Sequence, residues 1–457
     1  MKSKFEAAFA AVFIILMAAY CGLARADVQP GDSISKSNAD KVAGLVSPGN
    51  LILVKQGMSI HVVPSGRIEW PPPYKNATEK YSTQVSLAPN GDIKNFVAGQ
   101  PFPLLDPNDP QIAQKIMWNY SYRPMYTDDI DMRYPEVVTN KPNGQTDVGY
   151  FTAGHFAFYN NIGRIEVPPV PTDLSGVRQG IRFRFGFYPF LAPAGLRGYG
   201  LIRYRQIDPG QEDNTWVFNP QTRRVRRESP SLLSDAIAAM PGFAVAGGGG
   251  GGGPFGGGGG GGGSGSGGGG GQPFVNNIDP DSYFGFSAKI ENFNYKFLGD
   301  KEMLACVHAR NSPAIGCAAD GSRTICPEDW EKRHIFVVQA DEKPGKDLSI
   351  VRRVLYIDSE GWFITASDQY DRKGELWKTI AAYHTYRDRP VPDARIAIYP
   401  YKRVFQVALA DEDIQSGASS IVYMPGPNSP ERECWYIDMG VVDKQFFMPQ
   451  ALENAGH

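Results

Sequence analysis

The residues best suited to binding an anion lie in one stretch, Trp216–Arg227, in which four arginines surround a single valine. Arginine binds carboxylate and phosphate groups through paired hydrogen bonds, which favours a patch that meets a head group or an acidic partner. The alternative is a solvated edge strand whose charges prevent aggregation. Both interpretations stay open at this point. The candidate binding residues of the stretch are Trp216, Phe218, Arg223, Arg224, Arg226 and Arg227.

The sequence has no arrangement of residues typical of an active site. The run Gly247–Gly271 fits the dinucleotide pattern G-x-G-x-x-G, but it lacks the preceding strand and following helix that such a site needs. The histidines are scattered, and no nucleophile motif, P-loop or zinc-protease motif occurs. Asp368 and Asp371 resemble a carboxylate pair, although acidic residues at a strand end are usually solvated. We therefore predict no enzyme, no catalytic residues, no cofactor and no metal.

The amino terminus has the features of a secretory signal peptide, Met1–Ala26. Two lysines precede the apolar stretch Ala7–Ala19, and a small-x-small cleavage site ends at Ala26. The apolar stretch is too short to span a hydrocarbon core of about 30 Å. Lipidation at Cys21 is an alternative that the neighbouring Tyr20 disfavours. The sequence therefore predicts an exported protein whose mature form is soluble.

Four cysteines follow the predicted signal peptide, and an even number in an exported protein favours disulfides over metal binding. Cys317 and Cys326 bracket a polar loop, which favours pairing them and leaves Cys306 with Cys434. Three pairings exist in principle, and the sequence does not choose among them.

Composition limits the class of protein. The chain has 457 residues, of which 42% are hydrophobic and 21% charged, and its formal net charge is −2. This balance excludes a generally basic nucleic-acid-binding protein. The 25 phenylalanines and 22 tyrosines favour β-structure.

The elements expected to position these residues are mainly strands. Residues 27–99 read as an irregular arm with one or two strands, and Asp109-Pro110 opens a helix, Pro110–Tyr120, whose buried stripe carries Ile112 and Ile116. In Ile181–Phe187 apolar residues, including Phe183 and Phe185, alternate with arginines. We predict a large curled antiparallel sheet, in a mainly β fold with minor α. The further predicted strands are Leu201–Ile207, Thr215–Phe218, His334–Ala340, Val351–Asp358, Trp362–Asp368, Leu376–Tyr386, Ala394–Tyr399, Val404–Ala410 and Ile421–Met424.

A low-complexity segment divides the chain. A short predicted helix, Leu232–Met240, is followed by the glycine run Gly247–Gly271, which cannot bury enough surface to order itself. We interpret the run as a disordered insertion within one β domain made of residues 27–246 and 272–457, rather than as a linker between two domains.

Several stretches resemble the uncharacterised proteobacterial periplasmic family called domain of unknown function 1329. The glycine run departs from the family pattern. The resemblance implies a fold similar to the LolA/LolB lipoprotein carriers, an incomplete antiparallel β-barrel lidded by helices around an apolar cavity. The resemblance also implies that RND-type exporters and outer-membrane β-barrel proteins are partners of the protein. The stretches are Trp216–Arg227, Val351–Asp358, Tyr370–Lys378, Asn38–Lys41, Val54–Met58 and Trp70–Tyr74.

These inferences favour a periplasmic, non-enzymatic carrier or chaperone that binds a lipid or another hydrophobic molecule in the concave face of the sheet. The candidate ligand-binding residues outside the arginine stretch are Phe183, Phe185, Ile112 and Ile116. One alternative is an accessory docking subunit of an envelope transporter with no ligand of its own, and another is an envelope hydrolase. The interior is open to two interpretations, since the same aromatic residues can also form a solid core.

Overall fold

The computed structural model describes residues 28–140, 149–228, 280–310, 328–345, 350–426, 428–431, 433 and 435–456. The predicted signal peptide, the predicted helix Leu232–Met240 and the glycine run Gly247–Gly271 lie outside the described residues. The division of the chain into a signal peptide, one β domain and an insertion therefore stays a prediction.

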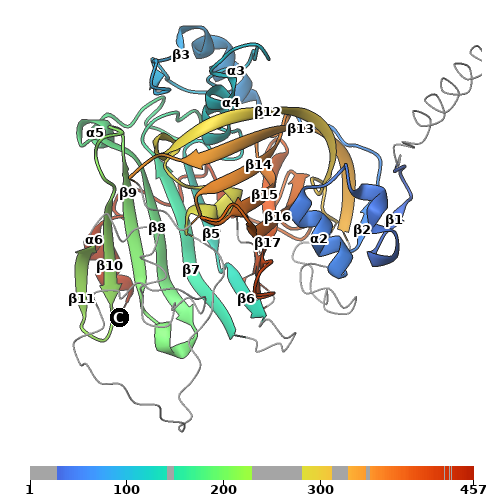
Figure 1. The fold of residues 1–457 in the computed structure, drawn as a ribbon. Helices are drawn as coiled ribbons and strands as arrows, with labels where there is room; N and C mark the ends of the chain where they lie inside the picture. Colours follow the sequence, from blue (N-terminus) through green and yellow to red (C-terminus); the bar gives the residue numbers. More distant parts are fainter. Residues whose placement is uncertain are drawn as a thin grey trace, which may run out of the picture.

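Seventeen of the described strands form one curved sheet with two halves (Figure 1). The first half comprises β5 (Asp129–Arg133), β6 (Glu136–Asn140), β7 (Gly149–Asn160), β8 (Ile181–Ala192), β9 (Gly200–Gln206), β10 (Asn214–Asn219) and β11 (Arg224–Glu228). The second half comprises β12 (Phe293–Ala305), β13 (Glu328–Glu342), β14 (Arg352–Asp358), β15 (Ile364–Tyr370), β16 (Leu376–Arg387), β17 (Arg403–Asp413) and β18 (Ser419–Tyr423).

The halves join through one antiparallel pair, β6 with β18, in which Val138 lies opposite Ile421. Within the described part of the chain, β11 pairs only with β10 and β12 only with β13, so the sheet is not closed into a barrel. Short strands extend it: β19 (Trp435–Ile437) pairs with β5, and β2 (Ile60–Val62) lies between β1 (Ser33–Ile34) and β13. The prediction of a mainly β, incomplete barrel is confirmed, although β2 pairs with β13 in parallel.

Helices occupy the region that we expected to be an irregular arm. The helix α2 (Pro48–Gln56) lies within this region and contains the apolar run Leu51–Lys55. It forms because Ser47 caps the helix by accepting a hydrogen bond from the backbone N–H of Asn50, and Pro48 occupies the first position. The remaining elements before β5 are η1 (Lys36–Val42), α3 (Pro72–Tyr81), η2 (Ser82–Gln84), and the two-stranded sheet of β3 (Ser86–Leu87) and β4 (Ile93–Lys94).

The predicted helix after Asp109 is present as α4 (Ile112–Ser121), and it lies with α3 at one end of the two halves (Figure 1). Ile112 and Ile116 are buried, as expected from their spacing. They belong to a cluster with Leu355 and Ile357 of the second half. The helix therefore packs onto the sheet.

Phenylalanines of β7 and β8 form the inner core of the first half. Phe156 and Phe185 have ring centroids 4.9 Å apart, and Phe151 and Phe190 have centroids 4.8 Å apart. The same cluster continues into the second half through Phe405, and side chains therefore fill much of the interior.

The outer face of the first half is covered by the carboxyl-terminal segment, which ends in α6 (Pro449–Ala455). Leu452 and Phe447 pack there against Phe218 of β10 and Tyr188 of β8. Four short elements complete the fold: α5 (Leu174–Arg178), η3 (Ala194–Leu196), η5 (Pro280–Gly285) and η6 (Ile290–Asn292).

One predicted strand, Ala394–Tyr399, is wrong. The backbone N–H groups of Arg395, Ile396 and Ala397 donate to the carboxylate of Glu433 instead of to a neighbouring strand. A side chain thus satisfies the donors that a sheet ladder would otherwise use. In the turn after β14, Asp358 accepts hydrogen bonds from the backbone N–H groups of Glu360 and Gly361.

Candidate functional site

A pocket of about 100 Å³ lies where α4, the first half of the sheet and the segment before β12 meet. Its walls are mainly aromatic and aliphatic, with three arginines among them. Such a mixture suits a ligand with an apolar body and a polar end. The lining includes Tyr120, Arg123 and Tyr126 near the end of α4, Phe158 and Asn160 of β7, Phe183 and Arg182 of β8, Arg205 of β9, and Phe284, Phe286 and Ile290 before β12.

A bulge in β8 gives the pocket both an apolar and a charged wall. The pairing with β9 shifts between Ile181 and Phe183, so Arg182 and Phe183 both line the pocket. Strict alternation would have placed them on opposite faces. Arg184, beyond the bulge, lies over the ring of Tyr204 on the outer face, as alternation predicts.

Two of the pocket arginines are paired with carboxylates. Arg182 forms an ion pair of 2.6 Å with Glu291, and Arg205 forms one of 2.6 Å with Asp213. Arg182 also lies 5.2 Å from the ring of Trp118, and Arg205 lies 5.3 Å from that of Phe183. Their charges are therefore compensated within the protein.

The segment η5 (Pro280–Gly285) and the residues after it form one wall of the pocket. The ring of Phe284 lies 6.2 Å from Phe156 and 6.0 Å from Phe158. The hydroxyl of Tyr120 donates to the carbonyls of Phe284, at 3.2 Å, and of Phe286. This wall is attached by side-chain packing, by these two hydrogen bonds and by a third, in which Nε2 of Gln369 in β15 donates to the hydroxyl of Ser282 at 2.9 Å, and it is outside the strand ladder.

The size of the pocket decides what fits without rearrangement. A water molecule needs a cavity of about 10–15 Å³, and drug-sized ligands occupy pockets of about 300–1,000 Å³. A cavity of about 100 Å³ therefore holds several waters or one small ring. A whole acyl chain enters only if part of the wall moves.

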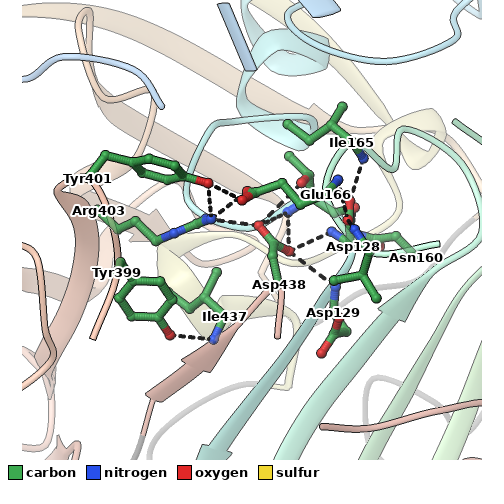
Figure 2. A network of polar contacts seen from close by, with 12 residues as sticks. Asp128, Asp129, Asn160, Ile165, Glu166, Tyr399, Tyr401, Arg403, Ile437 and Asp438 are labelled. Carbon is green, nitrogen blue, oxygen red and sulfur yellow. Dashed lines mark hydrogen bonds and ion pairs between the residues drawn. The ribbon is translucent and has the colours of Figure 1, made fainter. Parts of the chain in front are cut away.

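A buried polar network borders the pocket (Figure 2). Asp438 accepts hydrogen bonds from the backbone N–H groups of Thr127 and Asp128, at 3.0 and 2.7 Å, and forms an ion pair of 2.9 Å with Arg403. Arg403 also pairs with Glu166, which accepts from the hydroxyl of Tyr401. Thr127 lines the pocket, so the network fixes one of its walls.

Two aspartates of this network have raised pKa values. Burial, followed by the charge of Asp438, raises the pKa of Asp129 to about 7 and that of Asp128 to about 6. Asp128 accepts hydrogen bonds from the backbone N–H groups of Ile165 and Glu166, each at 2.7 Å. Both carboxyl groups are buried. Asp128 fastens the loop before α5 to the sheet, whereas Asp129 accepts hydrogen bonds from the backbone N–H of Gly440 in the carboxyl-terminal segment, at 3.1 Å.

Replacing Asp129 with asparagine is expected to stabilise the protein at pH 8 and to have little effect at pH 5. An aspartate in an unfolded chain titrates near 3.8, so the folded state binds an extra proton between about pH 4 and 7. The extra proton stabilises the folded state at low pH, and this stabilisation is lost as pH rises through about 7. At about 1.4 kcal/mol for each pKa unit, the difference between 3.8 and about 7 corresponds to at most about 4 kcal/mol. Because an amide reproduces the hydrogen bonds of the carboxyl group only in part, we expect Asp129→Asn to gain about 1–3 kcal/mol at pH 8, measured by urea unfolding.

Asp208 provides the control for this measurement. It is exposed and only accepts a hydrogen bond from the backbone N–H of Gly210. Asp208→Asn should leave the pH dependence of unfolding unchanged. A loss of stability in Asp129→Asn at both pH values would contradict the assigned titration.

Of the predicted ligand-binding residues, Phe183 lines the pocket and the others lie elsewhere. Phe185 belongs to the inner core, and Ile112 and Ile116 pack α4 onto the second half. Trp216 and Phe218 lie on the outer face of the sheet, where they pack with the carboxyl-terminal segment. The predicted arginines Arg223, Arg224, Arg226 and Arg227 are exposed at the edge hairpin of β10 and β11.

The residues at the end of α4 line the pocket but were not among the ligand-binding residues predicted from the sequence. The stretch Tyr120–Tyr126 reads Tyr-Ser-Tyr-Arg-Pro-Met-Tyr, with an arginine among three tyrosines. The acidic run Asp128–Asp131 follows it directly. This concentration of aromatic and charged residues was the signal that could have located the pocket.

Of the four cysteines in the predicted disulfides, the structure describes Cys306 alone. Cys306 is buried with a free thiol, and burial raises the pKa of this thiol well above its usual value. Cys317, Cys326 and Cys434 lie outside the described residues, so their pairing stays a prediction.

The residues considered for catalysis have structural roles. Asp368 is buried and accepts hydrogen bonds from Ser47 and Thr379, whereas Asp371 is exposed and caps a turn through the N–H of Lys373. His384 stacks on Phe363 with centroids 4.0 Å apart, and burial lowers its pKa to about 3. Among the described residues, no group of three His, Cys, Asp or Glu side chains is placed to hold a metal ion.

Comparison with known proteins identifies the family. The chain matches the family described as "Protein of unknown function (DUF1329)" over residues 33–245 and 276–453. The protein belongs to this family. The recognition made from the sequence stretches is thereby confirmed, and the glycine run lies between the two matched segments of this DUF1329 protein.

A curated relative of this DUF1329 protein is uncharacterized protein PA3922 of Pseudomonas aeruginosa, which is 23% identical over 379 residues, 80% of this chain and 72% of the relative. In the described part of the chain, no helix is both long and apolar enough to cross a membrane.

Three solved structures are similar, and each match covers 74% of this chain. A domain from Vibrio parahaemolyticus described as an outer membrane lipoprotein-sorting protein has 15% identity, a TM-score of 0.42 and 97% coverage of its own chain. A DUF1329 family protein from Desulfovibrio piger has 12%, 0.41 and 96%. The LolA superfamily protein NE2245 from Nitrosomonas europaea has 11%, 0.34 and 97%.

Proposed function

We propose that this DUF1329 protein is an exported, non-enzymatic carrier or chaperone that binds a hydrophobic ligand in the pocket at the end of α4. The observation that supports the proposal is an aromatic-walled pocket on the inner face of an open, curved sheet. The signal peptide predicted from the sequence supports a place in the periplasm. RND-type exporters and outer-membrane β-barrel proteins are the proposed partners, on the grounds of the family resemblance.

Ligand entry requires a wall that moves at low cost, and the segment around Phe284 meets this requirement. Its ring packs against Phe156, Phe158 and Tyr126, at 6.0–6.2 Å, and no strand pairing holds it. An apolar ligand that takes its place restores those contacts. Burial of about 300 Å² of ligand surface at about 25 cal/mol per Å² gains about 7 kcal/mol before the entropy cost of association.

We expect Phe284→Ala to bind an apolar fluorophore more tightly than the wild type, by about tenfold. The substitution removes a side chain that competes for the pocket, and the space left behind stays apolar because Phe156 and Phe158 line it. A titration with 1-anilinonaphthalene-8-sulfonate or N-phenyl-1-naphthylamine measures the affinity. Native mass spectrometry of the gently purified protein tests for a bound lipid.

Phe446 supplies a matched control, since it is a half-buried phenylalanine on the outer face that packs against Tyr188. Phe446→Ala should bind the fluorophore as the wild type does. If the wild type and Phe284→Ala both bind no fluorophore and both purify without lipid, the carrier proposal is wrong.

A docking role is the second candidate, and the hairpin of β10 and β11 favours it. Four arginines are exposed along an edge strand whose only partner among the described strands is β10. Such an edge can bind an acidic surface of an envelope protein. Cross-linking in envelope extracts with the wild type and with Arg224→Glu/Arg226→Glu tests this role. Loss of a partner without loss of fluorophore binding would favour docking.

A further inference from the structure

Arg123 lies at the centre of the aromatic wall of the pocket. Its side chain follows α4 directly, and only 5% of the residue is exposed. The guanidinium carbon lies 4.5 Å from the ring centroid of Tyr120, 4.9 Å from that of Phe284 and 5.5 Å from that of Tyr126. Three aromatic faces therefore surround one positive charge in the place where a ligand binds.

The hydrogen bonds of Arg123 are incomplete. Nη1 donates to the carbonyl of Tyr120 at 3.0 Å, and the charge of Arg123 opposes the rise that burial causes in the pKa of Tyr126. Nε is buried and has no partner in the structure. Within the described residues Arg123 forms no ion pair, whereas the other two pocket arginines, Arg182 and Arg205, each have a carboxylate within 2.6 Å.

The pocket therefore carries one positive charge more than its carboxylates compensate. A buried charge without a counter-ion is costly, and contacts with aromatic faces recover only part of that cost. An anionic group placed beside Arg123 would supply the missing acceptor for Nε and the missing negative charge. The guanidinium group is suited to this role because its planar donors match the two oxygens of a carboxylate or a phosphate.

We propose that the ligand is an amphiphile with a single anionic head group, which Arg123 binds, and an apolar body that packs against Phe158, Phe183 and the site of Phe284. This inference rests on the carrier function proposed above and specifies the class of its ligand. The head group is a carboxylate or a phosphate monoester, as in a fatty acid or an alkyl phosphate. Arg182 and Arg205 stay paired with Glu291 and Asp213 and shape the pocket around the ligand.

The test compares ligands that differ only in the head group. Dodecanoate, dodecyl phosphate and dodecanol share one chain, and displacement of a bound N-phenyl-1-naphthylamine probe measures the affinity of each below its micelle concentration. For the wild type we expect at least one of the two anions to bind at least tenfold more tightly than dodecanol. Whichever anion binds more tightly identifies the head group.

The variants assign the preference to Arg123. We expect Arg123→Gln to reduce the preference for the anion to within about twofold while dodecanol binds as before. Arg224→Gln, which removes an exposed arginine of β11, should keep the wild-type preference. Arg123→Lys keeps the charge but loses the planar donors, and we expect an intermediate preference. Circular dichroism and thermal melts verify that each variant is folded.

The outcomes separate the two proposals. If the wild type binds dodecanol and both anions equally, or if folded Arg123→Gln keeps the preference, the head-group assignment is wrong and the carrier function stands. If the wild type binds neither the probe nor any of the three ligands, the carrier function itself is wrong. If Arg123→Gln does not fold, two measurements still test the head-group assignment. Equal binding of the three ligands by the wild type would contradict it, and so would an anion preference in Arg123→Lys that equals that of the wild type.

Discussion

Replacement of Arg403 with leucine is expected to destabilise the protein by about 3–5 kcal/mol at pH 7.5. Arg403 is 2% exposed and neutralises the buried carboxylate of Asp438 and the half-buried carboxylate of Glu166. Removing one partner of a buried ion pair leaves the other charges uncompensated, which costs this amount in proteins of known stability. Leucine also loses the contacts of the guanidinium group with the rings of Tyr399 and Tyr401, at 5.0 and 4.9 Å.

The destabilisation caused by Arg403→Leu should shrink at pH 5. Burial raises the pKa of Glu166, and the charge of Arg403 opposes this rise. Without the arginine the pKa rises further, so protonation at low pH removes the uncompensated charge. Guanidinium chloride unfolding at the two pH values measures both effects.

Arg389 is the control for Arg403. It pairs with the neighbouring Asp388 on the surface, at 3.0 Å, and both side chains are solvated. Arg389→Leu should not change stability measurably, because exposed ion pairs contribute little. Equal losses in the two variants would show that the buried network has no special role.

Replacement of Gly49 with alanine is expected to cost about 2–4 kcal/mol. A Cβ atom at this position would lie 2.1 Å from Oγ1 of Thr379 and 2.4 Å from Oδ1 of Asp368, which forces α2 away from β15 and β16. The backbone N–H of Gly49 donates to Asp368 at 3.2 Å, and Ser47 donates to the same carboxylate at 3.0 Å. A shift of the helix therefore adds unpaired buried groups to the steric strain.

The chain contains a matched control for Gly49. Gly44 lies a few residues earlier, and a Cβ atom there meets no atom within 4 Å. Gly44→Ala should leave the midpoint of thermal unfolding within about one degree of the wild type, since exposed substitutions change stability by less than about 0.5 kcal/mol. A similar midpoint for Gly49→Ala would mean that α2 is not fixed to the sheet by this contact.

The sequence by itself determined the mainly β class, the family and most strand positions. Alternation in β8 placed Phe185 in the interior and Arg184 outside, because a half-buried strand has to separate the two kinds of side chain. The Asp109-Pro110 pair marked the start of α4 within about one turn. These signals are local, so no knowledge of distant residues was needed.

Only the tertiary structure decided where the site lies. Trp216 and Phe218 are aromatic, like many residues of the pocket. The register of β10 with β9 nevertheless turns them to the outer face, where the carboxyl-terminal segment covers them. The bulge at Arg182 depends on how β8 pairs with β9, and the approach of Phe284 to Arg123 joins segments more than 150 residues apart. Contacts of this range depend on how the strands pair and on where the chain returns, and no local pattern records either.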